Sequence, residues 1–142
     1  MTDEERAGWF WELVGGGPPP AVTTLGFALT SISTERGEVE GTFEAGANFR
    51  NLMGGVQGGF LAAMLDTTLS CALLATLPRG NLAPTIELKV NYLRPAPLGR
   101  LTGRGRVVHR GGTIAFLAGE LLDDQGETLT TATATARIVK PA

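Results

Sequence analysis

The feature of this sequence that most constrains its fold is a long apolar segment, residues 58–76 (GGFLAAMLDTTLSCALLAT). Its large side chains point in every direction of a helical wheel: Phe60, Leu61, Met64, Leu65, Leu69, Leu73 and Leu74. A helix with no polar face is expected to be buried on all sides. The chain has no run of about 18 apolar residues, so no transmembrane helix is expected. A chain of 142 residues can bury such a helix by wrapping a sheet around it.

The rest of the chain predicts that sheet. In residues 85–94 apolar and polar side chains alternate strictly, which is typical of a strand with one buried face. Five more strands are predicted at 22–30, 37–44, 100–110, 113–122 and 128–139, with short turn sequences between several of them. Small residues such as Gly103 and Gly105 on the inward face would let a helix come close. The prediction is an α+β domain: about six mostly antiparallel strands around one central helix.

The N-terminus predicts a separate arm. Residues 3–14 indicate a short amphipathic helix, and residues 15–20 (GGGPPP) end it because proline cannot continue a helix. Its expected apolar side is Trp9, Phe10, Leu13 and Val14. We therefore divide the chain into an arm with its hinge, residues 1–20, and a main domain, residues 21–142. The arm is expected to pack on its own body or on a partner subunit.

Composition excludes several classes of function. The net charge is −2, so no basic field recruits nucleic acid or an anionic membrane. With one histidine, His109, and one cysteine, Cys71, a single chain cannot build a Cys/His zinc site, and we expect no metal or redox cofactor. Cys71 cannot form an internal disulfide and is expected to be a small core residue; with the acidic N-terminus this indicates a cytoplasmic protein. His109 is expected to be structural, on the inner or an interface face.

The start of the central helix, Gln57-Gly58-Gly59, is a candidate binding element. The first N–H groups of a helix lack partners within it and carry partial positive charge. Glycines there let a ligand oxygen approach the backbone closely, which suits a polarised carbonyl or an oxyanion. The alternative is that the two glycines only make a tight turn.

Asp66 is a carboxylate in the middle of the apolar helix. Burying a carboxylate costs free energy unless it is hydrogen-bonded or paired. Asp66 is therefore a candidate general base or nucleophile. The alternative is a structural aspartate that is hydrogen-bonded by Thr67, Ser70 or the backbone. Gly59 and Asp66 are roughly 10 Å apart along one helix, too far for one carbonyl to touch both. If both act on one substrate, they come from two antiparallel copies, which predicts a homodimer across the central helix.

These residues carry a family resemblance. Residues 51–59 (NLMGGVQGG), followed by Asp66, resemble the signature of the hotdog-fold acyl-CoA thioesterases of the PaaI-like branch. Residues 91–99 (NYLRPAPLG) and 109–113 (HRGGT) are also similar, and the resemblance spans about residues 22–139. It implies hydrolysis of aryl- or medium-chain acyl-CoA thioesters to the free acid and CoA, with water as second substrate.

The resemblance also implies roles for matching positions. Asp66 would be the base or nucleophile, and Thr85 would orient the water near it. In the other subunit the N–H of Gly58, with Gly59, would polarise the thioester carbonyl, while Asn51 and Gln57 would help to hold that carbonyl or the water. Position 57 is often histidine in this family, and glutamine can orient by hydrogen bonds but cannot exchange a proton. A glutamine does occur in the aryl-CoA (4-hydroxybenzoyl-CoA) thioesterases, which favours aromatic acyl groups.

Arginine placement fits a CoA partner, because half of the ten arginines lie in residues 94–110. Alternation in a strand predicts four of them on one face: Arg100, Arg104, Arg106 and Arg110. Arg94 and Arg110, together with Gly111, border loops and are the expected phosphate contacts. The alternative is a solvated face balanced by acidic residues.

Two other functions compete with thioester hydrolysis. A non-catalytic acyl-CoA-binding or regulatory module on the same fold would keep the same binding residues, although it would gain nothing from a buried carboxylate. A hotdog dehydratase or hydratase would need a histidine paired with an acid, and position 57 is glutamine. We therefore predict an acyl-CoA thioesterase that forms a homodimer and, through it, a homotetramer, with neither nucleic acid nor membrane as partner.

Overall fold

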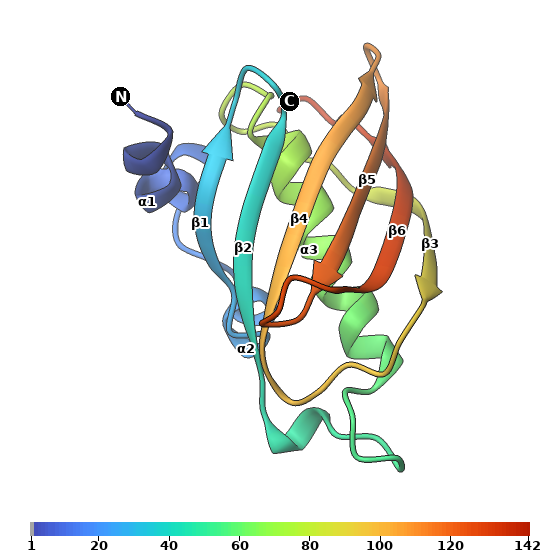
Figure 1. The fold of residues 1–142 in the computed structure, drawn as a ribbon. Helices are drawn as coiled ribbons and strands as arrows, with labels where there is room; N and C mark the ends of the chain where they lie inside the picture. The colour runs from blue at the N-terminus through green and yellow to red at the C-terminus, as the bar shows by residue number, and fades with distance from the viewer. Residues whose placement is uncertain (1) are drawn as a thin grey trace.

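The computed structural model describes residues 2–142 as one sheet wrapped around a long helix (Figure 1). The elements in chain order are α1 (Asp3–Val14), α2 (Pro20–Thr24), β1 (Ala28–Ser33), β2 (Glu38–Ala45), η1 (Ala47–Phe49), α3 (Gly58–Leu74), β3 (Thr85–Tyr92), β4 (Gly99–Arg110), β5 (Ile114–Leu122) and β6 (Thr128–Arg137). The strand order is β1-β2-β4-β5-β6-β3, and every neighbouring pair is antiparallel. This confirms the predicted α+β architecture.

The helix lies very close to the sheet because glycines face it. A Cβ atom on Gly103 would lie 2.6 Å from Thr68 Oγ1, and one on Gly119 would lie 2.7 Å from Leu69 Cδ2, both atoms of α3. The alanines of β6 add to this smooth inner surface, since Ala132, Ala134 and Ala136 are all buried. The predicted close approach is confirmed.

The prediction that the helix is buried on all sides is wrong for a single chain. Gly59 is exposed, and the following residues of α3 are only half-buried: Ala62, Ala63, Asp66, Thr67 and Ser70. Their spacing of three and four residues places them along one side of the helix. The single sheet covers the opposite side, where Leu65, Leu69 and Leu73 are fully buried. We call the uncovered stripe the open side of α3.

The first predicted strand is partly wrong. Residues 22–24 belong to the short helix α2, because Pro20 stands at its first position, where the fixed φ of proline favours a helix. Strand β1 starts at Ala28 instead and continues to Ser33, beyond the predicted end at residue 30. The first two strands are neighbours in the sheet, since β1 pairs antiparallel with β2.

The N-terminal arm packs on its own chain, beside β1 (Figure 1). A capping box between Thr2 and Glu5 starts α1. Ala7 and Phe10 are buried against a cluster formed by Ile32, Val39, Cys71 and Ala72. The expected apolar side is only partly right, since the side chains of Trp9 (56% exposed) and Leu13 (37% exposed) face outward.

Cys71 is buried in that cluster, and burial raises the pKa of its thiol to about 12. At pH 8 only roughly one thiol in 10⁴ would then be the reactive thiolate. We expect native protein to show no reaction with a disulfide reagent at pH 8, followed by one thiol per chain once guanidinium unfolds it. A spectrophotometric thiol titration with and without denaturant checks this. Rapid reaction of one thiol in the native protein would contradict the buried position.

None of the helices in residues 2–142 has the length and apolar character needed to cross a membrane. In the same residues no group of three or more His, Cys, Asp or Glu side chains is placed to hold a metal ion.

Candidate active site

The structure brings together two of the predicted site residues, Asp66 and Thr85. Asp66 lies half-buried on the open side of α3, and Thr85 is the first residue of β3. The Thr85 hydroxyl donates a hydrogen bond of 2.6 Å to Asp66 Oδ1. Within residues 2–142 the other carboxylate oxygen has no hydrogen-bond partner. The carboxylate is therefore held at one oxygen from a neighbouring element, while the other oxygen is available to water or a substrate.

The N-terminus of α3 presents free donors. Its entry is fixed by two backbone bonds, from Gln57 N–H to the Phe49 carbonyl (2.8 Å) and from Val56 N–H to the Ala96 carbonyl (2.9 Å). No side chain caps the helix, and the N–H groups of Gly58 and Gly59 find no acceptor in the described part of the chain. A partly positive helix terminus with unused N–H groups can bind a carbonyl or oxyanion.

Asn51 and Gln57 are placed differently. The Asn51 carboxamide oxygen accepts hydrogen bonds from the N–H groups of Met53 (2.9 Å) and Gly55 (3.2 Å), and its nitrogen donates to the Val56 carbonyl (3.5 Å). In this chain Asn51 thus shapes the loop that leads into α3. The Gln57 side chain is exposed at the helix start. Both roles toward a substrate stay predictions.

The expectation that Arg100, Arg104, Arg106 and Arg110 share one face is wrong at its last member. The pairing of β4 with β5 slips between Val107 and His109, so Val108 is an extra residue, a β-bulge. Beyond the bulge the alternation reverses, and Arg110 pairs with the fully buried Ala115 on the face toward α3. There the Arg110 guanidinium donates to the Thr76 carbonyl just after the end of α3 (2.6 Å).

The same bulge explains why one alternative predicted for His109, the inner face, is wrong; the other, an interface face, stays a prediction. His109 is exposed and pairs with Phe116 on the outer face of the sheet, with the two ring centroids 6.4 Å apart. A bulge of one residue leaves no recognisable mark in this sequence.

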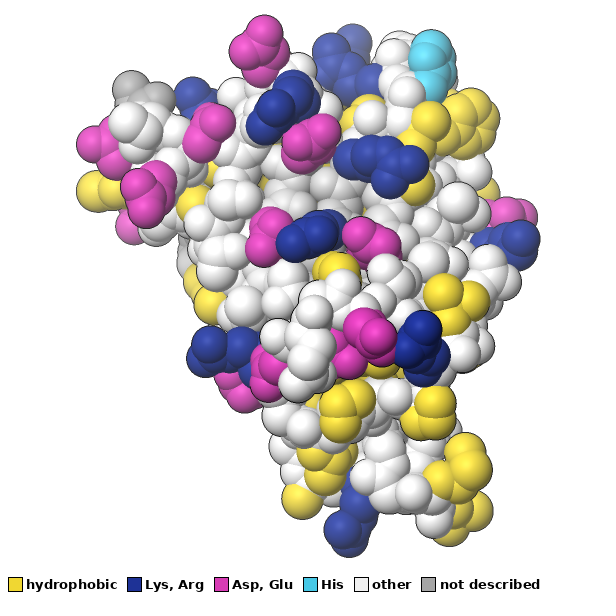
Figure 2. All heavy atoms as spheres, viewed as in Figure 1, with side chains coloured by type: hydrophobic (Ala, Val, Ile, Leu, Met, Phe, Trp, Pro, Cys, Tyr) yellow, Lys and Arg dark blue, Asp and Glu magenta, His cyan; other side chains and the backbone are white. Residues whose placement is uncertain are grey.

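Two of the remaining arginines form ion pairs across the outer face of the sheet. Arg100 pairs with Glu44 and Arg104 with Glu40, each at 3.1 Å, because β2 and β4 place them opposite one another. Figure 2 shows this face, where acidic and basic side chains lie next to each other. For Arg100 and Arg104 this supports the alternative to phosphate binding, a solvated face whose positive charges are balanced by acidic residues.

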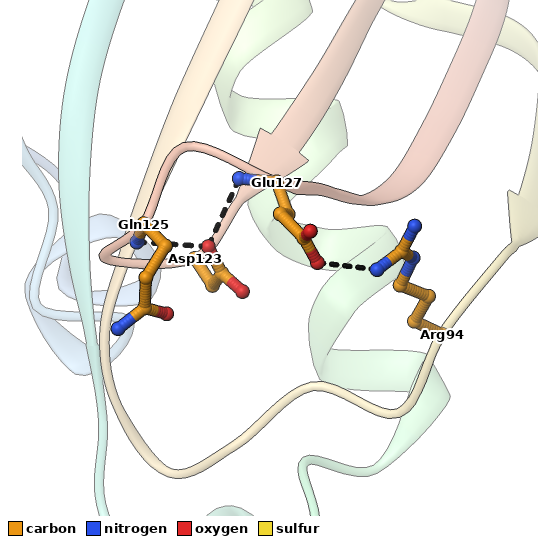
Figure 3. A network of polar contacts seen from close by, with 4 residues as sticks. All are labelled: Arg94, Asp123, Gln125 and Glu127. Carbon is orange, nitrogen blue, oxygen red and sulfur yellow. Dashed lines mark hydrogen bonds and ion pairs between the residues drawn. The ribbon is translucent and has the colours of Figure 1, made fainter.

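Arg94 also has an acidic partner. It follows β3 and pairs with Glu127 of the β5–β6 connection (Figure 3). Asp123 orders that connection, since its carboxylate accepts hydrogen bonds of 2.9 Å from the N–H groups of both Gln125 and Glu127. The positive charge of Arg94 is thus matched within the chain, although the predicted phosphate contact is not tested by this.

A basic cavity lies where the α3–β3 connection, the β4–β5 turn and the C-terminal segment meet. It measures about 520 Å³ and is lined by the predicted Arg110 and Gly111, together with Arg79 and Lys140. No acidic side chain is among its lining residues in the described chain. Arg79 and Lys140 were not predicted from the sequence, because three segments far apart in the chain line this cavity and no local pattern links them.

Comparison with known proteins identifies the family. The model of the thioesterase superfamily matches residues 53–130, more than half of the chain. This chain belongs to the thioesterase superfamily. The six-stranded sheet around one helix is the hotdog fold, as the resemblance implied.

Individual proteins with similar sequences or structures support this family assignment. A phenylacetic acid degradation-related protein of Ralstonia eutropha JMP134 is 38% identical, with 96% of this chain and 99% of that chain covered and a TM-score of 0.82. The PaaI protein of the E. coli phenylacetic acid degradation operon shares the fold, with a TM-score of 0.85, 20% identity and 99% of each chain covered. Human acyl-coenzyme A thioesterase 13 is 29% identical over 94 residues, 66% of either chain. The match to that enzyme thus spans just under two thirds of its length.

Proposed function

We propose that this protein hydrolyses acyl-CoA thioesters to a carboxylic acid and CoA, in the cytoplasm and without a metal or redox cofactor. The observation that carries the proposal is the Thr85–Asp66 hydrogen bond on the open side of α3. That side is where a second helix terminus with free N–H groups can approach the carboxylate. Membership of the thioesterase superfamily supplies the reaction class, and the name of the human relative supports CoA as the leaving group.

The proposed site needs two copies of the chain. Gly58 and Asp66 are eight residues apart, roughly 12 Å along α3, so one thioester cannot reach both in one chain. An antiparallel second copy would bring its Gly58 opposite Asp66. Two surfaces favour such a copy: the small side chains along the open side of α3, and strand β3, which ends the sheet with Ile86 60% exposed. We propose that two of these dimers associate further into a tetramer.

The proposed chemistry uses Asp66 in either of two ways. As a general base it takes a proton from the water that attacks the thioester carbon, and as a nucleophile it forms an anhydride that water then opens. In both, the carbonyl oxygen becomes an oxyanion that the N–H groups of Gly58 and Gly59 stabilise. The carbon–sulfur bond breaks, and CoA leaves as a thiolate that takes up a proton. Thr85 keeps the carboxylate oriented, and Gln57 and Asn51 hold the carbonyl or the water.

The test is release of free thiol from a panel of acyl-CoA esters: phenylacetyl-, benzoyl-, 4-hydroxybenzoyl-, hexanoyl- and palmitoyl-CoA. We expect hydrolysis of aromatic or medium-chain esters, and their ranking names the acyl class. Tight binding of an ester by calorimetry without release would instead support the regulatory acyl-CoA-binding module. Absence of both release and binding would overturn the ligand class.

The basic cavity is the proposed site for the phosphates at the nucleotide end of CoA, with Arg110 and Gly111 as contacts. Replacing Arg110 with alanine is expected to raise KM for an acyl-CoA about 10-fold, the loss of one charge-assisted hydrogen bond. KM for the matching acyl-pantetheine, which lacks the nucleotide, should not change. Steady-state kinetics with both substrates checks this, with Arg104→Ala on the outer face as control. Equal increases in KM for both substrates would contradict a phosphate contact.

A further inference from the structure

Tyr92 makes a contact at the N-terminus of α3 that the mechanism above does not use. It is the last residue of β3, and its hydroxyl donates a hydrogen bond of 2.8 Å to the carbonyl oxygen of Gly58. Its ring lies over that glycine, since a Cβ atom on Gly58 would be 3.2 Å from Tyr92 Cζ. The two residues are 34 positions apart, so this bond ties the end of an edge strand to the first turn of the helix.

The bond acts on the peptide that joins the two glycines. The carbonyl of Gly58 and the N–H of Gly59 are opposite ends of one planar unit, so a donor that holds the oxygen also fixes the direction of the N–H. A hydrogen bond to the oxygen also polarises the unit and strengthens its N–H as a donor. That N–H has no acceptor in the described residues, and Gly59 is exposed. Tyr92 therefore acts on a donor whose acceptor has to come from outside this chain.

The need for such an anchor follows from the residues themselves. Two consecutive glycines make the least restrained start that a helix can have, because neither has a side chain to limit its backbone. No side chain caps this helix start. The Tyr92 hydroxyl is thus the one side-chain hydrogen bond that the described structure gives to the Gly58–Gly59 pair.

The surroundings indicate what lies next to this peptide. A cavity of about 410 Å³ has Gly58 and Tyr92 in its wall, with Met53, Val56 and Leu61 among the apolar residues that line it. An apolar group attached to a carbonyl bound at the helix terminus would enter this space. The Tyr92 ring is thus one wall of the cavity, while its hydroxyl is turned to the Gly58 carbonyl.

We propose that Tyr92 is a positioning residue that aligns and polarises the Gly58–Gly59 peptide for the oxyanion formed during thioester hydrolysis. The inference rests on the proposed function. In this proposal the Tyr92 hydroxyl acts on the reacting carbonyl, whatever acyl group is attached to it. The Tyr92 ring forms a wall of the cavity.

Tyr92→Phe removes the hydroxyl and keeps the ring. We expect kcat to fall about 10-fold at unchanged KM, by the same factor for hexanoyl-CoA and benzoyl-CoA, because a weaker oxyanion donor acts in the transition state only. Thr133→Ala, exposed on the neighbouring strand β6, is the control and should leave both parameters unchanged. A change confined to KM, or one that differs between the two esters, would show a wall residue only and would overturn the proposal. A kcat within two-fold of wild type would overturn it as well.

A second measurement does not depend on turnover. In the ¹⁵N–¹H spectrum of the substrate-free protein, Tyr92→Phe should move the Gly59 amide resonance and leave that of Gly119, in strand β5, in place. An unmoved Gly59 resonance overturns the proposal even where the protein is an active thioesterase. A moved resonance in a protein that hydrolyses no ester supports the contact but overturns both the catalytic role of Tyr92 and the proposed function.

Discussion

Replacing Asp66 with asparagine is expected to lower kcat for thioester hydrolysis by about 10³-fold or more, because the amide neither accepts the proton of water nor attacks the carbonyl carbon. The substitution keeps the size of the side chain and an oxygen that can still accept the Thr85 hydroxyl bond. Acyl-CoA binding should therefore remain measurable by calorimetry. The comparison is a single-turnover assay of thiol release by wild type and variant at the same protein concentration.

Ser70→Ala is the control for that experiment. Ser70 lies one turn beyond Asp66 on the same half-buried side of α3, so its loss tests whether any polar change on this side disturbs the association of two copies. Size-exclusion chromatography should show the same assembly for wild type and both variants. If Asp66→Asn keeps near wild-type turnover, Asp66 is not the reacting group and the proposed mechanism fails.

The second large effect is expected on stability. Gly119→Ala should lower the free energy of unfolding by about 3 kcal/mol, a large share of the 5–15 kcal/mol of an ordinary domain. The new methyl group would lie 2.4 Å from the Arg104 carbonyl oxygen and 2.7 Å from Leu69 Cδ2. The first of these is backbone of the neighbouring strand, which cannot turn aside as a flexible side chain does.

Urea unfolding followed by circular dichroism measures that loss. Gly112→Ala is the matched control, because a Cβ atom there meets nothing within 4 Å, and its free energy of unfolding should stay within a few tenths of a kcal/mol of wild type. A Gly119→Ala midpoint equal to that of wild type would mean that Gly119 has more space than described, toward both Arg104 of β4 and Leu69 of α3.

Much of the fold is predictable from the sequence because it depends on patterns along the chain. In a domain of this size, the apolar segment that forms α3 can be buried only against a sheet. The alternating residues of β3 and β6 determine which face of each strand packs against the helix. Strand order is a different matter. Strand β3 lies beside β6, not beside β4. The residue pattern within a single strand does not indicate which other strand it pairs with.

Some residues of the candidate site were likewise predictable from the sequence, and others were not. Asp66 stood out in the sequence as a charge inside an apolar helix, and the resemblance supplied Thr85, which the structure brings within hydrogen-bond distance. The position of Arg110 was mispredicted because one extra residue at Val108 reverses the alternation of β4. The bond from Tyr92 to Gly58 joins residues 34 positions apart, so only the folded chain shows it.

The two edges of the sheet are unlike each other, and this limits how copies of the chain can add together. Helix α1 lies beside β1 at one edge, whereas β3 forms the other edge (Figure 1). An exposed strand is a template for further strands, and a sheet with two such edges can grow into a fibre. If two copies pair through β3, as proposed, each uses its uncovered edge, and the pair ends in helices on both sides. Growth by strand addition would then stop at two chains, and the arm would protect against fibrous aggregation.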